Sequence, residues 1–216
     1  MKNRNMKKLF ASLGCLAAFA LWTAAVRLLD VQAIGPCGSA VGLASLNHFV
    51  HNLTGVHMTL YTVTDWLGLV PFGFMLGFAV LGLVQWIKRR RLLAVDRSIL
   101  LLGVFYIAVT AAYLFFEDVV INYRPVLIQG FLEASYPSST TLLVLTVIPT
   151  TVMQLNCRIR SAVLQKGIVF LLTAFCVFMV LGRFLSGVHW LSDIIGGGML
   201  SAGLVMLYDF FRNGKL

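Results

Sequence analysis

Six long apolar runs dominate this sequence of 216 residues and constrain its fold more than any other feature. A helix needs about 20 mostly apolar residues to cross the hydrocarbon core of a bilayer. The chain is 59% hydrophobic and only 12% charged, whereas a soluble domain is about half apolar and a quarter charged. The sequence therefore predicts an all-α, polytopic membrane protein, a six-transmembrane-helix bundle that forms one membrane-embedded domain over residues 1–216. The expected spans are Leu9–Leu29, Trp66–Ile87, Ile99–Phe116, Thr140–Leu155, Ile168–Leu185 and Trp190–Phe210.

The first run has two interpretations. Its basic start, MKNRNMKK, would suit a signal peptide. The apolar run is longer than the core of a typical signal peptide, and no clean small-residue cleavage site follows it. The length therefore favours a retained span.

The positive charges predict how the chain is oriented, because cytoplasmic loops of membrane proteins carry an excess of Lys and Arg. With the N-terminus in the cytoplasm and six alternating spans, fourteen of the seventeen Lys and Arg residues fall on the cytoplasmic side. We therefore expect an integral plasma membrane protein with both termini cytoplasmic. The net charge of +9 is therefore explained by the basic residues that set the membrane topology. Nucleic acid is not expected as a partner.

Three arginines remain on the outer side, and one of them stands in the segment Gly182–Asp193. Arg183 can bind a phosphate through two parallel contacts. His189 and Asp193 are four residues apart, so on a helix they would share a face. An aspartate can hold one imidazole nitrogen and leave the other free to attack. Ionisable groups beside membrane-embedded sequence usually mark function, so this segment predicts a histidine-nucleophile phosphoryl-transfer site.

The other outer arginines are Arg27, which suits an interfacial anchor, and Arg124, which lies in the loop after the third span. Before the fourth span, Pro137 is followed by Ser138 and Ser139, which is a strong helix-start signal. A helix N-terminus offers unpaired N–H groups and a positive dipole end, so it can bind an anion. By topology, these segments and Gly182–Asp193 all lie on the outer face.

At this point the sequence resembles the type 2 phosphatidic acid phosphatase superfamily of membrane phosphatases. That family has three motifs: Lys-x6-Arg-Pro, Pro-Ser-Gly-His and Ser-Arg-x5-His-x3-Asp. Their order and spacing agree with this chain over the whole six-span layout. The matching positions here are Arg124-Pro125 for the first motif, Pro137-Ser138-Ser139-Thr140 for the second, and Gly182-Arg183, His189 and Asp193 for the third.

The resemblance implies a role for each matching residue. His189 would attack phosphorus and form a phosphohistidine, and Asp193 would orient it. Arg124, Arg183, Ser138 and backbone N–H groups near Ser139 would hold the phosphoryl oxygens. The resemblance implies no metal and no other cofactor. The expected partners are the membrane and a lipid phosphate or diphosphate substrate.

The chain departs from the family pattern at two positions besides Gly182. Glu117 occupies the position of the first-motif lysine, seven residues before Arg124. A carboxylate cannot bind a phosphate directly, although it can orient an arginine. Thr140 occupies the position of the second-motif histidine, which in this family is understood to protonate the leaving group. A threonine hydroxyl is far too weak an acid for that step, so the roles of Glu117 and Thr140 stay open.

Thr140 leaves three interpretations. The enzyme acts where no strong acid is needed, as on a polyprenyl diphosphate, whose leaving group is a phosphate monoester. Alternatively, His48, His51 or His57 of the outer loop supplies the proton. Finally, the chain is a catalytically weak or inactive relative that binds phospholipid. The first is our main hypothesis: a membrane lipid phosphatase that works at the outer face. A lipid phosphotransferase would use the same pocket.

Overall fold

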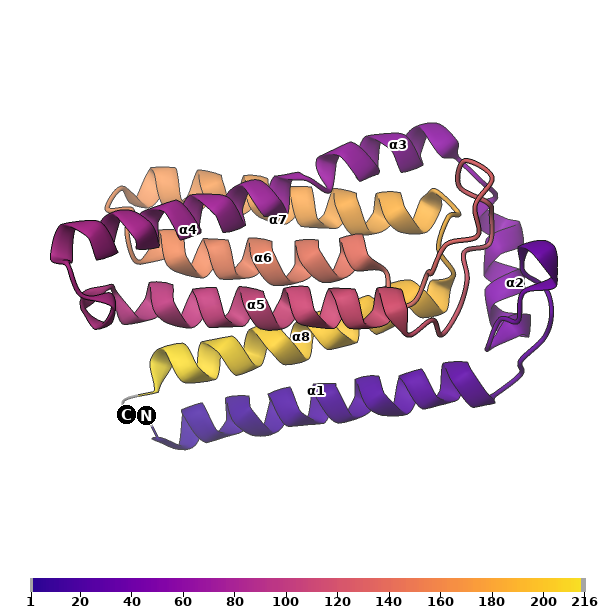
Figure 1. Cartoon of the computed structure of the whole chain (residues 1–216), viewed down its shortest axis with the longest axis horizontal. Helices are drawn as coiled ribbons and strands as arrows, with labels where there is room; N and C mark the ends of the chain where they lie inside the picture. Colours follow the sequence, from indigo (N-terminus) through magenta and orange to yellow (C-terminus); the bar gives the residue numbers. More distant parts are fainter. Residues whose placement is uncertain (1, 215–216) are drawn as a thin grey trace.

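Residues 2–214 are described here by a computed structural model. Within that range the chain forms eight α-helices and two short 3-10 turns. Figure 1 shows that the long helices run side by side, while one short helix lies across an end of the bundle. The α-helices are α1 (Lys2–Leu28), α2 (Ala44–Thr54), α3 (Met58–Leu67), α4 (Val70–Arg89), α5 (Arg97–Asp118), α6 (Ser139–Asn156), α7 (Ala162–Leu185) and α8 (Leu191–Asn213).

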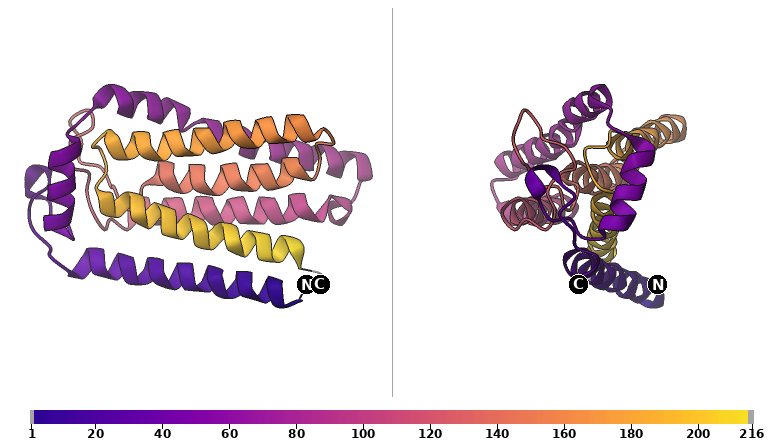
Figure 2. Two further views of the ribbon diagram at one scale, coloured as in Figure 1. Left: turned by 180° about the vertical axis from the view of Figure 1, so that it is seen from behind. Right: turned by 90° about the vertical axis from the view of Figure 1, so that its right-hand side faces the viewer.

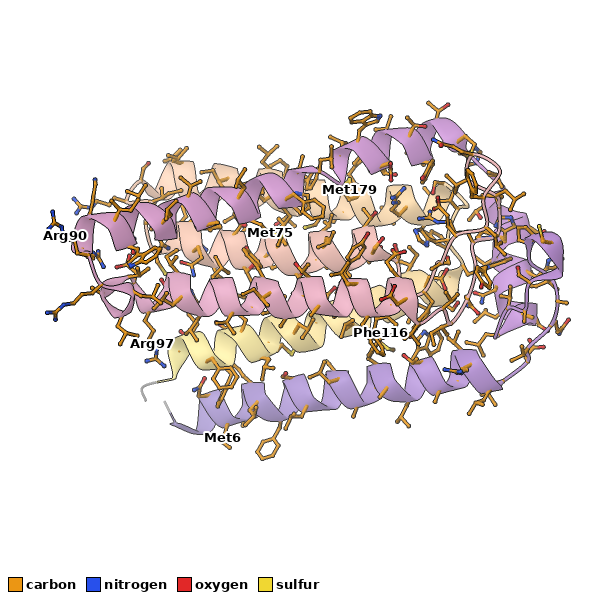
Figure 3. All side chains as sticks on the ribbon, in the orientation of Figure 1. Met6, Met75, Arg90, Arg97, Phe116 and Met179 are labelled. Atoms are coloured by element: carbon orange, nitrogen blue, oxygen red, sulfur yellow. The ribbon has the colours of Figure 1, made fainter. Side chains whose placement is uncertain are left out.

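The two ends of the bundle differ in their charge. One end carries both chain termini and the loops 90–96 and 157–161 (Figures 1 and 2). Arg90 and Arg97 lie at this end (Figure 3). The opposite end carries α2 and the connections α5–α6 and α7–α8. The basic loops and the predicted site segments therefore lie at opposite ends of the molecule.

Among the residues that the structure describes, five helical segments are long and apolar enough to cross a membrane. They are Asn5–Leu28, Met58–Arg89, Arg97–Asp118, Ala162–Leu185 and Leu191–Asn213. Many of their outward side chains are apolar and exposed, as at Leu76, Ile107 and Phe170. Such surfaces suit a lipid environment, in which apolar side chains need no cover.

The predicted fourth span, α6, does not belong to those five, because threonines and Pro149 lower its hydropathy. It packs against α4, α5, α7 and α8, and most of its side chains are buried. A central helix that faces other helices rather than lipid can carry hydroxyl groups if they are hydrogen-bonded. Thr146 and Thr150 meet that condition by donating to backbone carbonyls of the preceding turn.

The predicted second span is longer than expected and is broken. It begins at Met58 rather than Trp66, and α3 and α4 meet at Gly68-Leu69. The break brings α3 against α7. As a result, Tyr61 and Asp65 of α3 reach the site described below.

Helix α1 packs along α8 for most of its length (Figure 1). The buried Ser12 hydroxyl donates to the Gly203 carbonyl at 2.8 Å, and Leu16 fills the space beside Gly203. Trp22 donates from its ring N–H to the Ser192 carbonyl at 3.0 Å. The first apolar run is thus an integral part of the bundle.

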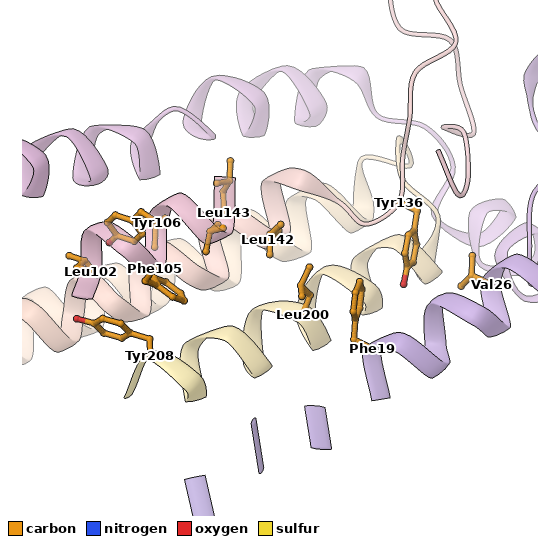
Figure 4. Packing of buried hydrophobic residues seen from close by; sticks show 12 residues of the cluster. Phe19, Val26, Leu102, Phe105, Tyr106, Tyr136, Leu142, Leu143, Leu200 and Tyr208 are labelled. Atoms are coloured by element: carbon orange, nitrogen blue, oxygen red, sulfur yellow. The ribbon is translucent and has the colours of Figure 1, made fainter. Parts of the chain in front are cut away.

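Tyr136 anchors the loop before α6 into the core (Figure 4). Its ring stacks on Phe19 of α1, with centroids 6.2 Å apart, and its hydroxyl lies 2.7 Å from the Thr23 hydroxyl. Gly196 of α8 lets the ring approach, because a Cβ at that position would lie 2.7 Å from it. The sequence Gly196-Gly197 therefore serves close packing, as its position in the sixth apolar run indicates.

We expect Gly196→Ala to destabilise the protein, because the added methyl group collides with the buried Tyr136 ring. Overpacking of this kind costs about 1–3 kcal/mol. Thermal unfolding in detergent measures the effect. Gly198→Ala is the matched control, because nothing lies within 4 Å of a Cβ there. Equal unfolding temperatures for the two variants would contradict this account of the packing.

Candidate active site

Three segments meet at the end of the bundle opposite the termini. The α7–α8 loop carries His189, the first turn of α8 carries Asp193, and the loop before α6 carries Ser135. All three side chains are buried. The expectation that His189 and Asp193 share a helix face is wrong, because α8 begins only at Leu191.

A serine hydroxyl stands between the histidine and the aspartate. Ser135 Oγ donates a hydrogen bond to Asp193 Oδ2 and lies 3.1 Å from His189 Nδ1. The direct separation of His189 Nδ1 from Asp193 Oδ2 is 3.8 Å, which is too long for a hydrogen bond. Because the Ser135 proton goes to Asp193, its oxygen accepts from His189 Nδ1–H. This arrangement leaves the lone pair on Nε2.

Asp193 is fixed by several further contacts. Its Oδ2 accepts the backbone N–H of Trp190 at 2.9 Å, and its Oδ1 accepts the Ser192 hydroxyl at 3.3 Å. Its backbone carbonyl accepts the N–H of Ser138 at 3.1 Å. Asp193 therefore ties the start of α8 to the start of α6.

His189 is held neutral by its surroundings. Burial, followed by the nearby charge of Arg124, lowers the pKa of the imidazole to about 4, against the opposing effect of Asp193. Its Nε2 atom is buried and has no hydrogen-bond partner among the described residues. A neutral imidazole with a free Nε2 lone pair is the form that can act as a nucleophile.

Arg183 is almost fully buried and is held by two side chains. Its Nε and Nη2 atoms donate to the Thr140 hydroxyl oxygen at 3.0 and 2.7 Å, and Nη2 also donates to Asp65 at 2.8 Å. Nη1 is left without a partner in the part of the chain that the structure describes. Thr140 therefore positions the guanidinium and keeps one of its edges free.

Arg124 lies beside Arg183. The two guanidinium groups lie 5.9 and 4.9 Å from the centre of the Tyr61 ring. Arg124 Nε is 3.0 Å from a Glu133 carboxylate oxygen, but its N–H is not aligned for a hydrogen bond. Nη1 likewise has no partner among residues whose side chains the structure describes. Two buried guanidinium groups with unused donors form a site suited to an anion.

The N-terminus of α6 points into the same region. Ser138 is the N-cap residue, and its buried hydroxyl accepts from Thr141 at 3.0 Å. Ser139 is the first residue of the helix and lines the cavities described next. The first N–H groups of a helix lack intrahelical partners, so they add to the anion site.

A cavity of about 670 Å³ opens beside the arginines. Its wall includes both guanidinium groups, Thr140, Ser139 and Glu117. His189 does not line it, but lines a small adjoining pocket of about 10 Å³. Glu117 and Ser139 belong to both walls, so the two spaces meet at these residues.

Some expectations from the sequence differ from this arrangement. The carboxylate that touches Arg124 is Glu133 rather than Glu117. His48, His51 and His57 line neither cavity, and His51 packs on the Trp190 ring instead. The alternative in which one of them replaces the missing acid therefore has no structural basis.

Packing explains the glycine at position 182, where the family that the sequence resembles has serine. A Cβ there would lie 2.6 Å from the Thr64 side chain of α3. Glycine lets α3 pack closely on α7, which brings Asp65 to Arg183.

Sequence reasoning assigned no role to Tyr61, Asp65, Glu133 or Ser135. The first two come from a helix far away in the sequence, and no motif marks them. Ser135 and Glu133 stand just before the Pro137 helix start, in a cluster of polar residues. That polar cluster was the only sequence feature that pointed to Glu133 and Ser135. It did not indicate which side chains they contact.

We expect His189 to take up its second proton only near pH 4, because burial and Arg124 disfavour the imidazolium ion. Nitrogen NMR of histidine-labelled protein in detergent measures this midpoint, and a His189→Asn variant assigns the signal. A midpoint near the ordinary value of 6.5 would contradict the described environment.

The comparisons with known proteins agree with the architecture. No protein-family model and no curated protein matches the sequence. A solved structure does match: the first transmembrane PAP2 type phosphatidylglycerolphosphate phosphatase from Bacillus subtilis. The TM-score is 0.63 at 18% identity, over 93% of this chain and 95% of the other. The resemblance to the type 2 phosphatidic acid phosphatases is confirmed at the level of the fold, and the chain is an integral membrane protein with that fold.

Proposed function

We propose that this protein is a membrane lipid phosphatase that hydrolyses a lipid phosphate or diphosphate ester through a phosphohistidine on His189. One observation carries the proposal: His189, whose buried Nε2 has no partner among the described residues, lies in a pocket that adjoins the cavity lined by Arg124 and Arg183, and both arginines have unused donors. The fold shared with a membrane phosphatase supports it.

The proposed reaction has two steps. In the first, the Nε2 lone pair attacks phosphorus, and the bond to the leaving oxygen breaks with its electron pair going to that oxygen. The proton on Nδ1 stays there, hydrogen-bonded to the Ser135 hydroxyl. In the second, the oxygen of a water molecule bonds to phosphorus, the bond from phosphorus to Nε2 breaks with its electron pair returning to Nε2, and phosphate leaves. The proton that the water loses balances the one that the leaving oxygen takes up. Arg124, Arg183 and the N-terminus of α6, with Ser138 and Ser139, hold the phosphoryl oxygens. Preorganised donors of this kind supply much of the rate enhancement in such sites.

The proposed topology has six crossings, with α3 and α4 as one span and α6 as the central one. The end with the termini and the basic loops faces the cytoplasm, in line with the positive-inside rule. The site then opens at the outer face of the plasma membrane. Helix α2 lies there in the interface, with Leu46, Phe49 and Leu53 exposed, as expected of an interfacial helix.

For the substrate we favour a polyprenyl diphosphate. Its leaving group is a phosphate monoester, which departs with less help from an acid than an alkoxide does. Thr140 provides no such help, since its hydroxyl is a weak acid and its oxygen is engaged by Arg183. An inactive phosphate-binding relative or a phosphotransferase would use the same pocket, so the assay below is designed to distinguish them.

We expect purified protein in detergent to release phosphate from a polyprenyl diphosphate faster than from phosphatidic acid. His189→Ala should lower both rates by at least about 10³-fold, because the nucleophile is removed. His48→Ala is the matched control, since that exposed histidine lies outside both cavities. A His189→Ala protein as active as its parent would rule out the mechanism.

Failure of the parental protein to release phosphate from either lipid would favour the inactive relative. Thr140→His then tests whether a missing acid is the cause, with Thr140→Val as its control for the lost contact to Arg183. Release of the lipid product without free phosphate, in the presence of an acceptor lipid, would identify a phosphotransferase.

A further inference from the structure

The polyprenyl diphosphate favoured above has the better leaving group. A lipid monophosphate at the same site leaves an alkoxide when the bond between phosphorus and the alkyl oxygen breaks, and that oxygen must take up a proton. The second step has the reverse need, because the attacking water must lose one. No histidine besides His189 lines either cavity of the described structure. A group other than histidine must therefore move this proton.

Three carboxyl groups line the larger cavity, and only one is unpaired. Asp65 binds Arg183, and Glu133 contacts Arg124. Glu117 forms no hydrogen bond and no ion pair with any other described residue. It is also the only carboxyl group that belongs to both walls, so it lies between the His189 pocket and the arginines.

The charges of the cavity support a proton on Glu117. Two arginines and three carboxyl groups face the space, so their charges balance when one carboxyl group is neutral. Asp65 and Glu133 each lie beside a guanidinium, and Glu117 is the group left over. Glu117 is exposed, so it can exchange protons with water.

We propose that Glu117 is the acid–base residue of this site, an inference that rests on the function proposed above. In the first step His189 Nε2 bonds to phosphorus, the bond to the leaving oxygen breaks, and that oxygen takes the Glu117 proton. In the second step the Glu117 carboxylate takes a proton from water as the water oxygen bonds to phosphorus. The bond from phosphorus to nitrogen then breaks, phosphate leaves, and Glu117 is protonated again.

This assignment accounts for both unusual positions together. A carboxylate at position 117 cannot bind the phosphate, but a protonated carboxyl group there can donate its proton to the leaving oxygen. A threonine at position 140 cannot donate that proton effectively, but it holds Arg183. The proton donor, Glu117, therefore lies on α5, and the residue that holds Arg183, Thr140, lies on α6.

The test measures release of the leaving group in a single turnover, with enzyme in excess and the full chain in detergent. The two substrates are dioctanoyl phosphatidic acid, whose leaving group is an alcohol, and 4-nitrophenyl phosphate, whose leaving group needs no acid. Glu117→Gln should slow diacylglycerol release by about 10²–10⁴-fold, the usual value of general acid catalysis. Nitrophenol release should change by no more than about threefold.

The matched control is Asp118→Asn, which removes the adjacent carboxylate of the same helix but lines neither cavity; it should leave both rates at the parental value. Glu117→Asp keeps the acid on a shorter arm and should recover part of the loss. Thermal unfolding identifies any variant that fails to fold. If Glu117→Gln does not fold, the rates of Glu117→Asp on the same two substrates are compared with the parental rates instead.

Equal losses on the two substrates, or no loss on either, would overturn the role of Glu117. A selective loss in Tyr113→Phe but not in Glu117→Gln would also overturn it, because the Tyr113 phenol lines both cavities as well. His189→Ala separates the two proposals. If it keeps the parental rates, the proposed function itself fails. If it is inactive while Glu117→Gln behaves like its parent, only the present inference fails.

Discussion

The rest of the site depends on the hydrogen bonds that the buried Asp193 accepts. Its side chain accepts from Ser135 and from the backbone of Trp190, and its carbonyl accepts from Ser138. One residue thus fixes the imidazole, the start of α8 and the start of α6. A buried carboxylate is costly unless it is fully hydrogen-bonded, and here the cost is met by the groups that it must position.

Arg124 and Arg183 differ from Asp193 in that their hydrogen-bonding capacity is only partly used. Both guanidinium groups are buried, yet within the described part of the chain the Nη1 atom of each has no partner. Leaving such donors unsatisfied is unfavourable, and a phosphate in the cavity would remove the penalty. The partners that they do have, Thr140, Asp65 and Glu133, hold the guanidinium groups in place without using every donor. Both arginines line the cavity, at the same end of the bundle as His189.

Much of the fold could be predicted from the sequence, because apolar length and charge asymmetry are local signals. The break at Gly68 was not predictable, because it serves the packing of α3 on α7 rather than a local preference. The central position of α6 explains its threonines, whose hydroxyl groups face other helices. The sequence motifs led to His189, Asp193, Arg124 and Arg183, and the structure brings these residues together.

The connections within the site could not be predicted, since they join residues far apart in the sequence. Asp65 and Arg183 are 118 positions apart, and Ser135 and Asp193 are 58 apart. Thr140 was interpreted from the sequence as a lost acid. The structure gives it a second role, as the acceptor that holds Arg183.

The most direct test of the account is to trap the covalent intermediate. Protein mixed with a lipid substrate labelled in its terminal phosphate is quenched within the first turnover and analysed by peptide mass spectrometry. The account predicts an acid-labile, base-stable phosphoryl group on His189 that is absent from the His189→Ala variant. Turnover with no phosphorylated peptide at any time point, or a phosphoryl group on another residue, would contradict it.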